Sequence, residues 1–580
     1  MPAQPPHILG QASQLARQGR AGEAIALLRR AMTKDPGDPQ LPHLLAQLLT
    51  GTGQPEQSSY LLGRASELYE ASLRRTGANV PDLVGLADVR MSLKDPAGAE
   101  DAWRRAIALD PAHPAPRSQL ANALLMLGRG NESAALLREG LARRPNDAAL
   151  LGLFCSASNY ADDLAPEEVF AAHRALGELM AQRAARSVPP LPARTLSPAD
   201  ADRPLTIGYV SGDLREHSVA HFAEPLLRHA DRAMFRVKIY DTYTGVRKPD
   251  ARRDRLRALA PDWTEAFALN DAQLVQKIRA DGVDVLMDLS GLTGSSRVEI
   301  FAAGPAPLQG TYCGYPNTTG LRAIDLRFTD GLADPVGQTD RFHVEHLVRL
   351  DPCFLAYTPP EHAPEPAARD DAAPITFGSF NAAAKLTPTT LDLWAQTVLA
   401  VPGSRLLVKA MALQSDELRR PLEKALEARG LSGRFEVLGR VPDPRDHLNT
   451  YARVDIGLDT FPYHGTTTTC EALWMGVPVV SLVGATHASR VGLSLLSAAG
   501  LSDLAATTRE SFVERARGLA QDAPRRAELR RTLRETLRTG VLCDGAGLAR
   551  RFEAAVREAW RARCGGGSTG GANPAGAPSR

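Results

Sequence analysis

The sequence is poor in the features that mark secreted, membrane-bound or nucleic-acid-binding proteins. Its six cysteines lie far apart and form no C-x-x-C pair, which favours reduced thiols and a cytoplasmic location. Its 68 basic and 66 acidic residues give a formal net charge of +2, without the basic excess of a nucleic-acid-binding protein. No apolar run is long enough to span a membrane, and no basic-plus-apolar start predicts a signal peptide. We therefore expect neither nucleic acid nor a membrane as a partner.

The first part of the chain contains a repeat. Small and apolar residues return after 34 positions, in one pair of segments as Ala12 to Ala46 and Leu28 to Leu62, and in a second pair as Ala87 to Ala121 and Ala106 to Gly140. Between the two pairs the step is 41, so about seven residues are inserted near 69–81. This period is typical of tetratricopeptide repeats, in which antiparallel helix pairs stack into a curved solenoid. We expect a repeat domain over residues 1–150 whose concave face binds peptide.

After the repeats the pattern changes to α/β. Residues 151–203 are expected to hold further helices, to about residue 187, that cap the solenoid, and then a Pro-rich linker. Short apolar runs that are typical of buried parallel strands follow in two sets, at 205–210, 235–240 and 283–288, and at 375–380, 405–409, 435–438, 454–458 and 477–482. A Pro-rich segment at 358–374 separates the sets. We predict two doubly wound lobes, 204–373 and 374–563, that face one cleft, and a disordered tail at 564–580.

The stretch from Leu458 to Pro478 carries the most informative local pattern. A buried strand leads through a Pro/Gly turn into four threonines, Thr466 to Thr469, that open an apolar helix. Free backbone N–H groups, hydroxyls and the helix dipole at such an end form an anion site, typically for phosphate. Glu471 lies one turn further and suits a neutral diol such as a ribose. The alternative for this motif alone is a threonine N-cap on an ordinary helix.

Three further side chains are candidates, and each has an ordinary structural alternative. His217 follows the first strand of the first lobe at a helix entrance, where it can contact a bound group or act as a cap. With His221 it would share a helix face, but a metal ion would need a third ligand that this stretch lacks. Lys385 lies in the turn that opens the second lobe, where it can meet a phosphate or lie on an exposed face. His447 can stack on a planar base or be a surface residue.

Two absent motifs restrict the chemistry. The sole D-x-D, at Asp200 and Asp202, lies inside the predicted linker, so no strand-end motif is present to hold a divalent metal on a diphosphate. The charge of a leaving group would then have to be met by Lys385 and the threonine-rich helix end. No Gly-x-Gly-x-x-Gly follows the first strand of either lobe, which argues against a dehydrogenase.

The combination of these motifs closely resembles the O-GlcNAc transferase and SPINDLY family. The resemblance rests on the repeats and on five later motifs, which are Gly208-Tyr-Val-Ser with its downstream His217, Gly304-Pro-Ala-Pro, Gly314-Tyr-Pro-Asn-Thr-Thr-Gly320, Phe377-Gly-Ser-Phe-Asn381 with Lys385, and Leu458 to Glu471. It implies a GT-B-type catalytic region with two Rossmann-like lobes. It also implies inverting transfer of one sugar from a nucleotide diphosphate donor to Ser or Thr hydroxyls, without a metal or another cofactor.

The resemblance also implies roles for individual residues. His217 matches the active-site histidine near the acceptor and the sugar, which has been proposed as the general base. Lys385 matches the lysine that neutralises the leaving diphosphate. The nucleotide-sugar site is implied by the remaining matches, Thr467 and Thr468 on the phosphates, Glu471 on the ribose and His447 on the nucleobase.

Several departures concern the donor. Ala382 stands where O-GlcNAc transferases carry Gln, and Thr466 stands where they carry His. Asn317 to Gly320 and Ser489 to Leu496 resemble the SPINDLY branch, which uses GDP-fucose in plants. The donor is therefore expected to be UDP-GlcNAc or GDP-fucose. The alternatives are transfer of another activated sugar to a bacterial surface protein such as flagellin, and a non-catalytic repeat scaffold that binds a nucleotide sugar. The expected partners are acceptor proteins bound through the repeats, and a second copy of the chain can pair through the same repeats.

Overall fold

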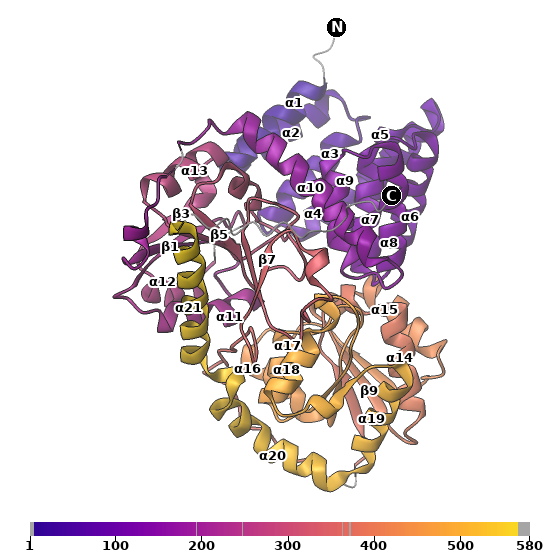
Figure 1. Ribbon diagram of the computed structural model, residues 1–580. Helices are drawn as coiled ribbons and strands as arrows, with labels where there is room; N and C mark the ends of the chain where they lie inside the picture. Colours follow the sequence, from indigo (N-terminus) through magenta and orange to yellow (C-terminus); the bar gives the residue numbers. More distant parts are fainter. Residues whose placement is uncertain (1–4, 193, 246–247, 362, 370–372, 566–580) are drawn as a thin grey trace, which may run out of the picture. The chain divides into compact units, whose positions relative to one another are not determined.

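The computed structural model describes residues 5–192, 194–245, 248–361, 363–369 and 373–565 (Figure 1). The described chain forms two compact units, one made of residues up to 124 with 135–145, the other of residues 125–134 with those from 146 onward. Most of the predicted tail, from residue 566, lies outside the described residues. No described helix is both long and apolar enough to cross a bilayer.

The first unit is built from antiparallel helix pairs, which confirms the repeat prediction. The helices of the repeat are α1 (Pro5–Arg17), α2 (Ala21–Lys34), α3 (Gln40–Gly51), α4 (Pro55–Thr76), α5 (Val80–Ser92), α6 (Pro96–Leu109), α7 (Pro114–Met126) and α8 (Gly130–Arg143). The repeated small residues Ala12, Ala46, Ala87 and Ala121 are buried, as close helix packing requires. Helix α4 has 22 residues where α2 and α6 have 14, so the insertion lengthens one helix by about two turns.

The loop between α7 and α8 belongs to the second unit and meets the connection that carries Lys385. Gly128 has a φ of +73°, and a Cβ atom there would lie 2.5 Å from the Leu386 carbonyl oxygen. Only glycine satisfies both the left-handed backbone and this close approach. The loop therefore packs directly on the catalytic part of the chain.

Two all-parallel sheets form the frame of the second unit, which confirms the predicted two-lobed fold. The first has the order β3-β2-β1-β4-β5-β6-β7 and the second the order β10-β9-β8-β11-β12-β13. Their strands are β1 (Leu205–Ser211), β2 (Phe235–Asp241), β3 (Trp263–Glu265), β4 (Val285–Asp288), β5 (Leu308–Thr311), β6 (Leu326–Thr329), β7 (His346–Arg349), β8 (Thr376–Ser379), β9 (Arg405–Lys409), β10 (Phe435–Leu438), β11 (Ile456–Leu458), β12 (Val479–Leu482) and β13 (Ala505–Ala506). In both sheets the strand order reverses beside the first strand, and ligands bind at such a point.

Helices cover these sheets and also tie the lobes together. They are α9 (Ala148–Ser158), α10 (Pro166–Ser187), α11 (Ser218–His229), α12 (Ala251–Leu259) and α13 (Asp271–Ala280), then α14 (Pro388–Leu399), α15 (Asp416–Glu427), α16 (Pro444–Asn449), α17 (Thr467–Trp474), α18 (Val491–Ala498), α19 (Arg509–Gln521), α20 (Ala523–Thr539) and α21 (Gly545–Cys564). Helices α9 and α10 pack on the first lobe. There the Tyr315 hydroxyl donates to the Cys155 carbonyl (2.9 Å) and lies 2.8 Å from His173 Nε2.

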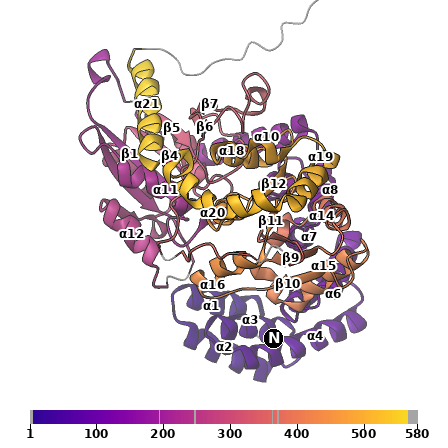
Figure 2. The ribbon, with the colours of Figure 1, turned by 90° about the horizontal axis from the view of Figure 1, so that it is seen from below.

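The last helix returns to the first lobe although it follows the second lobe in sequence. Figures 1 and 2 both show α21, in yellow, beside α11. The Phe552 ring packs 4.5 Å from the Phe328 ring, and the Trp560 indole N–H donates to the Asp200 carbonyl at 2.9 Å. The chain consequently crosses between the lobes twice, and the backbone N–H of Tyr357 at the first crossing donates to the Leu542 carbonyl at the second (2.7 Å).

A buried carboxylate fixes the Pro-rich stretch that precedes β1. Asp284, with 2% of its side chain exposed, accepts from Arg203 (2.7 and 2.8 Å), Arg194 (2.7 Å) and the backbone N–H of Thr206 (2.9 Å). Burial opposes its ionisation, but the guanidinium of Arg203 and these hydrogen bonds hold the pKa of Asp284 below its usual range. The predicted linker is therefore anchored to the amino end of β4, away from the carboxyl ends of the strands.

We predict that Asp284→Ala lowers the free energy of unfolding by about 1.5–3 kcal/mol, because two partly exposed guanidinium groups and the Thr206 N–H lose a charged hydrogen-bond acceptor. The folded pKa is depressed, so this stabilisation is present above pH about 4 and fades as the carboxyl protonates at lower pH. Denaturant titration of wild type and variant at pH 7 and pH 3 tests both points. Asp202→Ala is the control, because its pair with Arg561 is exposed and worth about 1 kcal/mol or less. Equal effects of the two substitutions would contradict the prediction.

Candidate functional site

One cavity of about 390 Å³ collects segments that follow the carboxyl ends of strands in both sheets. In the first lobe the cavity is lined by the segments that follow β1, β4 and β5 and by residues of β6. In the second lobe it is lined by the segments that follow β8, β11 and β12. Of the predicted site residues, His217, Lys385, Thr467 and Thr468 line it, whereas His447 and Glu471 lie in an adjoining cluster. Ligands bind at this edge of parallel sheets, so the cavity is the candidate site.

Lys385 is a half-buried cation that is held at the cavity by the second lobe. It ends a 3₁₀ turn, Ala383–Lys385, between β8 and α14. Its Nζ donates to the His464 carbonyl oxygen at 2.6 Å and lies 3.9 Å from the centre of the Tyr463 ring. Burial lowers the pKa of Lys385 to about 8, and the charge of Asp459 opposes part of that shift. An ammonium group that is poorly solvated in this way gains most from an anionic ligand.

The turn between β11 and α17 is fixed by two buried polar side chains. Asp459 accepts from the backbone N–H groups of Thr460 (2.9 Å) and Gly465 (2.7 Å) and from the Ser481 hydroxyl (2.5 Å). His464 accepts at Nδ1 from the Gly492 N–H (3.0 Å), so its Nε2–H donates to the Leu482 carbonyl (2.8 Å). The turn is therefore rigid before any ligand arrives.

The threonines open the helix as the sequence predicts, and one of their hydroxyls is left without a partner. Helix α17 begins at Thr467, and its first ladder bond runs from the Cys470 N–H to the Thr466 carbonyl (3.0 Å). The N–H groups of Thr467, Thr468 and Thr469 therefore precede the ladder. The Thr467 hydroxyl is buried and has no hydrogen-bond partner among the described residues. A buried unpaired hydroxyl at a helix N-terminus fits an anion such as a phosphate.

Residues 459–468, which follow β11 and include the start of α17, form what we call the phosphate-type turn. Contacts between this turn and the connection after β8 hold it close to Lys385. The Thr468 hydroxyl donates to Asn381 Oδ1 at 3.0 Å, and the Asn381 amide in turn donates to the Ser379 hydroxyl at 3.2 Å. A Cβ atom on Gly465 would lie 2.5 Å from the Thr468 hydroxyl and 3.0 Å from Asn381 Oδ1, so the turn has no room for a larger residue there.

His217 faces the same cavity from the first lobe, as the N-cap of α11. Its Nδ1 accepts from the Val219 N–H at 3.3 Å and lies 3.7 Å from Asp213 Oδ1. Burial lowers the pKa of His217, against the charge of Asp213, so the ring is neutral near pH 7. An Nδ1 that accepts leaves the proton on Nε2, which therefore acts as a donor toward the cavity.

His221 does not join His217. Its Nδ1 lies 2.9 Å from the Thr358 carbonyl, and its ring stacks on Tyr357 with centroids 5.3 Å apart. Among the described residues, no group of three or more His, Cys, Asp and Glu side chains is arranged to hold a metal ion.

His447 and Glu471 contact each other beside the turn. His447 Nε2 lies 3.2 Å from Glu471 Oε2, and the Tyr451 hydroxyl lies within hydrogen-bonding distance of two acceptors, that oxygen (3.3 Å) and the Thr468 carbonyl (3.2 Å). Lys409 completes the cluster, with its Nζ 2.5 Å from His447 Nδ1. Burial lowers the pKa of Lys409, against the charge of Glu471. Sequence reasoning found the two ends of this cluster but missed Lys409 and Tyr451, which carry no motif.

Other cavity residues were also missed from the sequence. Tyr160 reaches the cavity from the loop before α10 and packs 5.0 Å from the Tyr463 ring. Arg327, on β6, and His487, after β12, line the cavity too. The strand β6 was not predicted, and no local pattern marks these three residues as neighbours.

Comparisons with known proteins agree with this geometry. Residues 192–356 and 368–547 match the profile of Glycosyl transferase family 41, and residues 15–78 and 90–153 match the Tetratricopeptide repeat. A Hordeum vulgare protein named probable UDP-N-acetylglucosamine–peptide N-acetylglucosaminyltransferase SPINDLY is 41% identical over 421 residues, 71% of this chain and 43% of that protein. The Arabidopsis thaliana protein of the same name is 41% identical over 374 residues, 63% of this chain and 40% of that protein.

A solved structure is similar over almost the whole chain. A mutant of Thermobaculum terrenum O-GlcNAc transferase has a TM-score of 0.78 and 34% sequence identity, and the match covers 97% of this chain and 98% of that one. The chain spans less than half the length of the plant relatives. Because the family profile covers more than half of the residues and includes every strand of both sheets, the chain belongs to glycosyltransferase family 41.

Proposed function

We propose that the protein transfers one sugar from a nucleotide diphosphate donor to Ser or Thr side chains of acceptor proteins, with inversion and without a metal ion. The observation that carries this proposal is the convergence of an unpaired, buried Thr467 hydroxyl and the half-buried Lys385 ammonium on one cavity at the edges of two parallel sheets. Both groups favour a diphosphate. The donor is UDP-GlcNAc or GDP-fucose, and the names of the plant relatives support the former.

The nucleotide lies on the second lobe in this proposal. Thr467, Thr468 and the helix N-terminus hold the phosphates, because the first N–H groups of α17 precede its ladder and the Thr467 hydroxyl has no partner among the described residues. Glu471 accepts from the ribose diol, and His447 stacks on the base. Their present contact, at 3.2 Å, keeps the two side chains beside the phosphate-type turn, linked to it through Tyr451.

Transfer then needs little from the protein beyond charge and position. The acceptor hydroxyl oxygen attacks the anomeric carbon from the face opposite the diphosphate, the bond from that carbon to the phosphate oxygen breaks, and the hydroxyl proton passes, directly or through water, to the departing diphosphate. Lys385 and the helix N-terminus stabilise the negative charge that develops on the diphosphate. His217 is a donor at Nε2 in this structure, so we assign it to hydrogen bonding with the substrates and not to proton removal.

Identification of the donor tests the proposal. Purified protein is incubated with UDP-GlcNAc or GDP-fucose and a host lysate in EDTA, and modified peptides are located by mass spectrometry. We expect one sugar on Ser or Thr with one of the donors. Transfer that requires Mg²⁺, or hydrolysis of a donor with no transfer to any protein, would contradict it.

We predict that Lys385→Ala lowers kcat by about 10²–10³, because a stabiliser of the leaving charge is worth about 3–4 kcal/mol. The measurement is donor turnover together with a thermal unfolding scan that shows an intact fold. Lys424→Ala, an exposed lysine on α15 of the same lobe, is the control and should turn over normally. Near-normal turnover of Lys385→Ala would remove this residue from the mechanism.

The pKa of Lys385 predicts a pH dependence. The group must be protonated to act, and its folded pKa is lowered to about 8, so kcat/KM should fall about tenfold per pH unit above pH 8. Initial rates from about pH 6.5 to 9.5 at low donor concentration measure this fall in kcat/KM. A profile that stays flat to pH 9.5 would show that the ammonium charge is not needed.

We predict that Glu471→Ala weakens the nucleotide itself by one to two decades, because a charge-assisted hydrogen bond to the ribose is lost. The loss should be equal for UDP and UDP-GlcNAc, or for GDP and GDP-fucose, since both members of a pair carry the ribose. Calorimetric titration measures it, with Glu427→Ala on the surface of α15 as control. Unchanged diphosphate affinity would place the nucleotide elsewhere.

The repeats are predicted to serve the acceptor and not the donor. Deletion of residues 1–109 should reduce protein modification more than donor hydrolysis, because every residue assigned to the donor lies beyond Pro204. The deletion stops before α7, since the loop that follows α7 packs on the Lys385 connection. Equal modification of protein acceptors by the truncated and full-length enzymes would refute a role for the repeats.

A further inference from the structure

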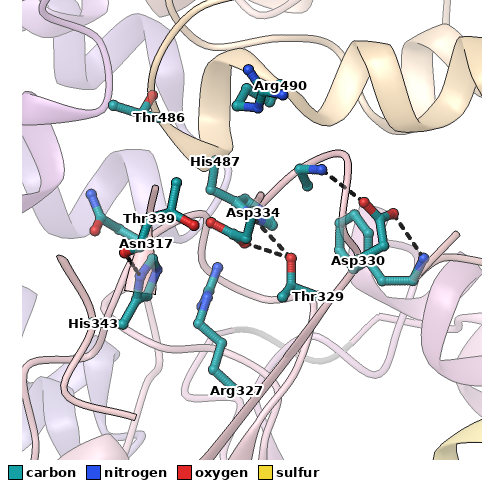
Figure 3. A network of polar contacts seen from close by, with 12 residues as sticks. Asn317, Arg327, Thr329, Asp330, Asp334, Thr339, His343, Thr486, His487 and Arg490 are labelled. Atoms are coloured by element: carbon teal, nitrogen blue, oxygen red, sulfur yellow. Dashed lines mark hydrogen bonds and ion pairs between the residues drawn. The ribbon is translucent and has the colours of Figure 1, made fainter. Parts of the chain in front are cut away.

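The two lobes meet at a buried polar contact that the mechanism above does not use. The contact joins the segment 486–494 of the second lobe to 327–334 of the first (Figure 3). Arg490 Nε donates to the Leu332 carbonyl (2.8 Å), and the Ser494 hydroxyl donates to Asp330 Oδ1 (2.8 Å). Between these bonds and the cavity, His487 Nδ1 lies 2.6 Å from Asp334 Oδ2.

Asp334 fixes the orientation and the proton of the His487 ring. Its carboxyl is buried and also accepts from the Thr329 hydroxyl (2.5 Å). Burial opposes ionisation, but His487 holds the pKa of Asp334 well below its usual range. An ionised carboxylate only accepts, so Nδ1 of His487 donates to it, and Nε2 is left to bond a ligand on the cavity side. No described residue bonds to Nε2, and the ring is part of the cavity wall with 7% of the residue exposed.

Backbone bonds place His487 directly beside the phosphate-type turn. The His464 N–H donates to the carbonyl of Ala488, the next residue, at 3.1 Å. The His464 ring accepts from the Gly492 N–H in the same segment (3.0 Å). If the residues from Gly465 to Thr468 hold the diphosphate, His487 borders the group that follows it, which is the sugar.

Arg327 supplies the complementary donor. The residue is 3% exposed and lines the cavity, and its Nη2 donates to the Tyr315 carbonyl at 3.0 Å. Its Nε is buried without a partner among the described residues, and so are Asp334 Oδ1 and His343 Nε2. Figure 3 shows its guanidinium end directed toward Asp334. Buried polar atoms without partners indicate a ligand or a bound water.

We propose that His487 and Arg327, held in place by Asp334, bind a hydroxyl group of the transferred sugar. The Asp334 carboxylate offsets the positive charge at this point of the cavity, which weakens the attraction for an anionic ligand. A hydroxyl group fits both side chains, because it can accept from the guanidinium and can either donate to Nε2 or accept from it. The choice of sugar is thus made where the two lobes meet. This inference rests on the proposed function and assigns the residues that determine specificity for the sugar.

Calorimetric titration with matched ligand pairs tests the subsite. UDP-GlcNAc is compared with UDP, and GDP-fucose with GDP, for wild type and His487→Ala. In the pair that wild type binds, the affinity for the sugar nucleotide should fall about tenfold relative to that for the free diphosphate, since one hydrogen bond to the sugar is lost and a buried partner is left unpaired. Asp334→Asn should shift the ratio in the same direction by a smaller factor, because it acts through the ring.

Ser494→Ala is the matched control, because it removes a buried bond between the same two segments without touching the cavity. Its affinity ratio should stay within twofold of wild type. If His487→Ala does not fold, His487→Gln replaces it, with the same expected direction. An unchanged ratio in the folded variants, or an equal loss for sugar nucleotide and diphosphate, overturns the subsite alone. Failure of wild type to bind either pair overturns the proposed function and the subsite together.

Discussion

The site depends on one buried carboxylate, that of Asp459. It accepts from two backbone N–H groups in the turn after β11 and from a hydroxyl on β12, so a strand, a turn and the next strand share a single charged acceptor. The same turn presents the His464 carbonyl to Lys385 and the helix end to the cavity. Buried charge–dipole contacts of this kind are rigid, because every alternative leaves a charge without a partner. The anion-binding groups are consequently in position before a ligand arrives.

The cavity divides its chemistry between the lobes. The second lobe supplies the cation, the helix N-terminus and the cluster around Glu471, all of which favour a nucleotide diphosphate. The first lobe supplies His217 and Arg327, which are hydrogen-bond donors in this arrangement. His487 belongs to the second lobe by sequence but takes its orientation from Asp334 of the first. Parts of the site are therefore complete within one lobe, whereas the contact that we propose with the sugar requires both.

Much of the fold followed from hydrophobic patterns, and the exceptions have physical reasons. The strands β1, β2, β4 and β8 to β12 were predicted, because each is an apolar run bounded by turn residues. The strands β3, β5, β6, β7 and β13 were missed, since β3 and β13 have just three and two residues, and polar side chains interrupt the apolar run in the other three, as in His346–Arg349. In the site, the threonines before α17 have a local signature. Asp334 and His487 are 153 positions apart and meet only through the docking of the lobes.

The double crossing between the lobes has a mechanical consequence. The chain leaves the first lobe after Tyr357 and returns to it between α20 and α21, and a backbone hydrogen bond of 2.7 Å joins the two crossings. Two adjacent crossings define a line that can serve as a rotation axis for the lobes. Sliding or twisting of one lobe past the other would strain both connections at once, whereas rotation about that line would strain neither. Rotation about that line is therefore the least strained motion of the lobes, and His487 lies close to the line, because its ring packs 5.3 Å from the ring of Phe354, three residues before the first crossing.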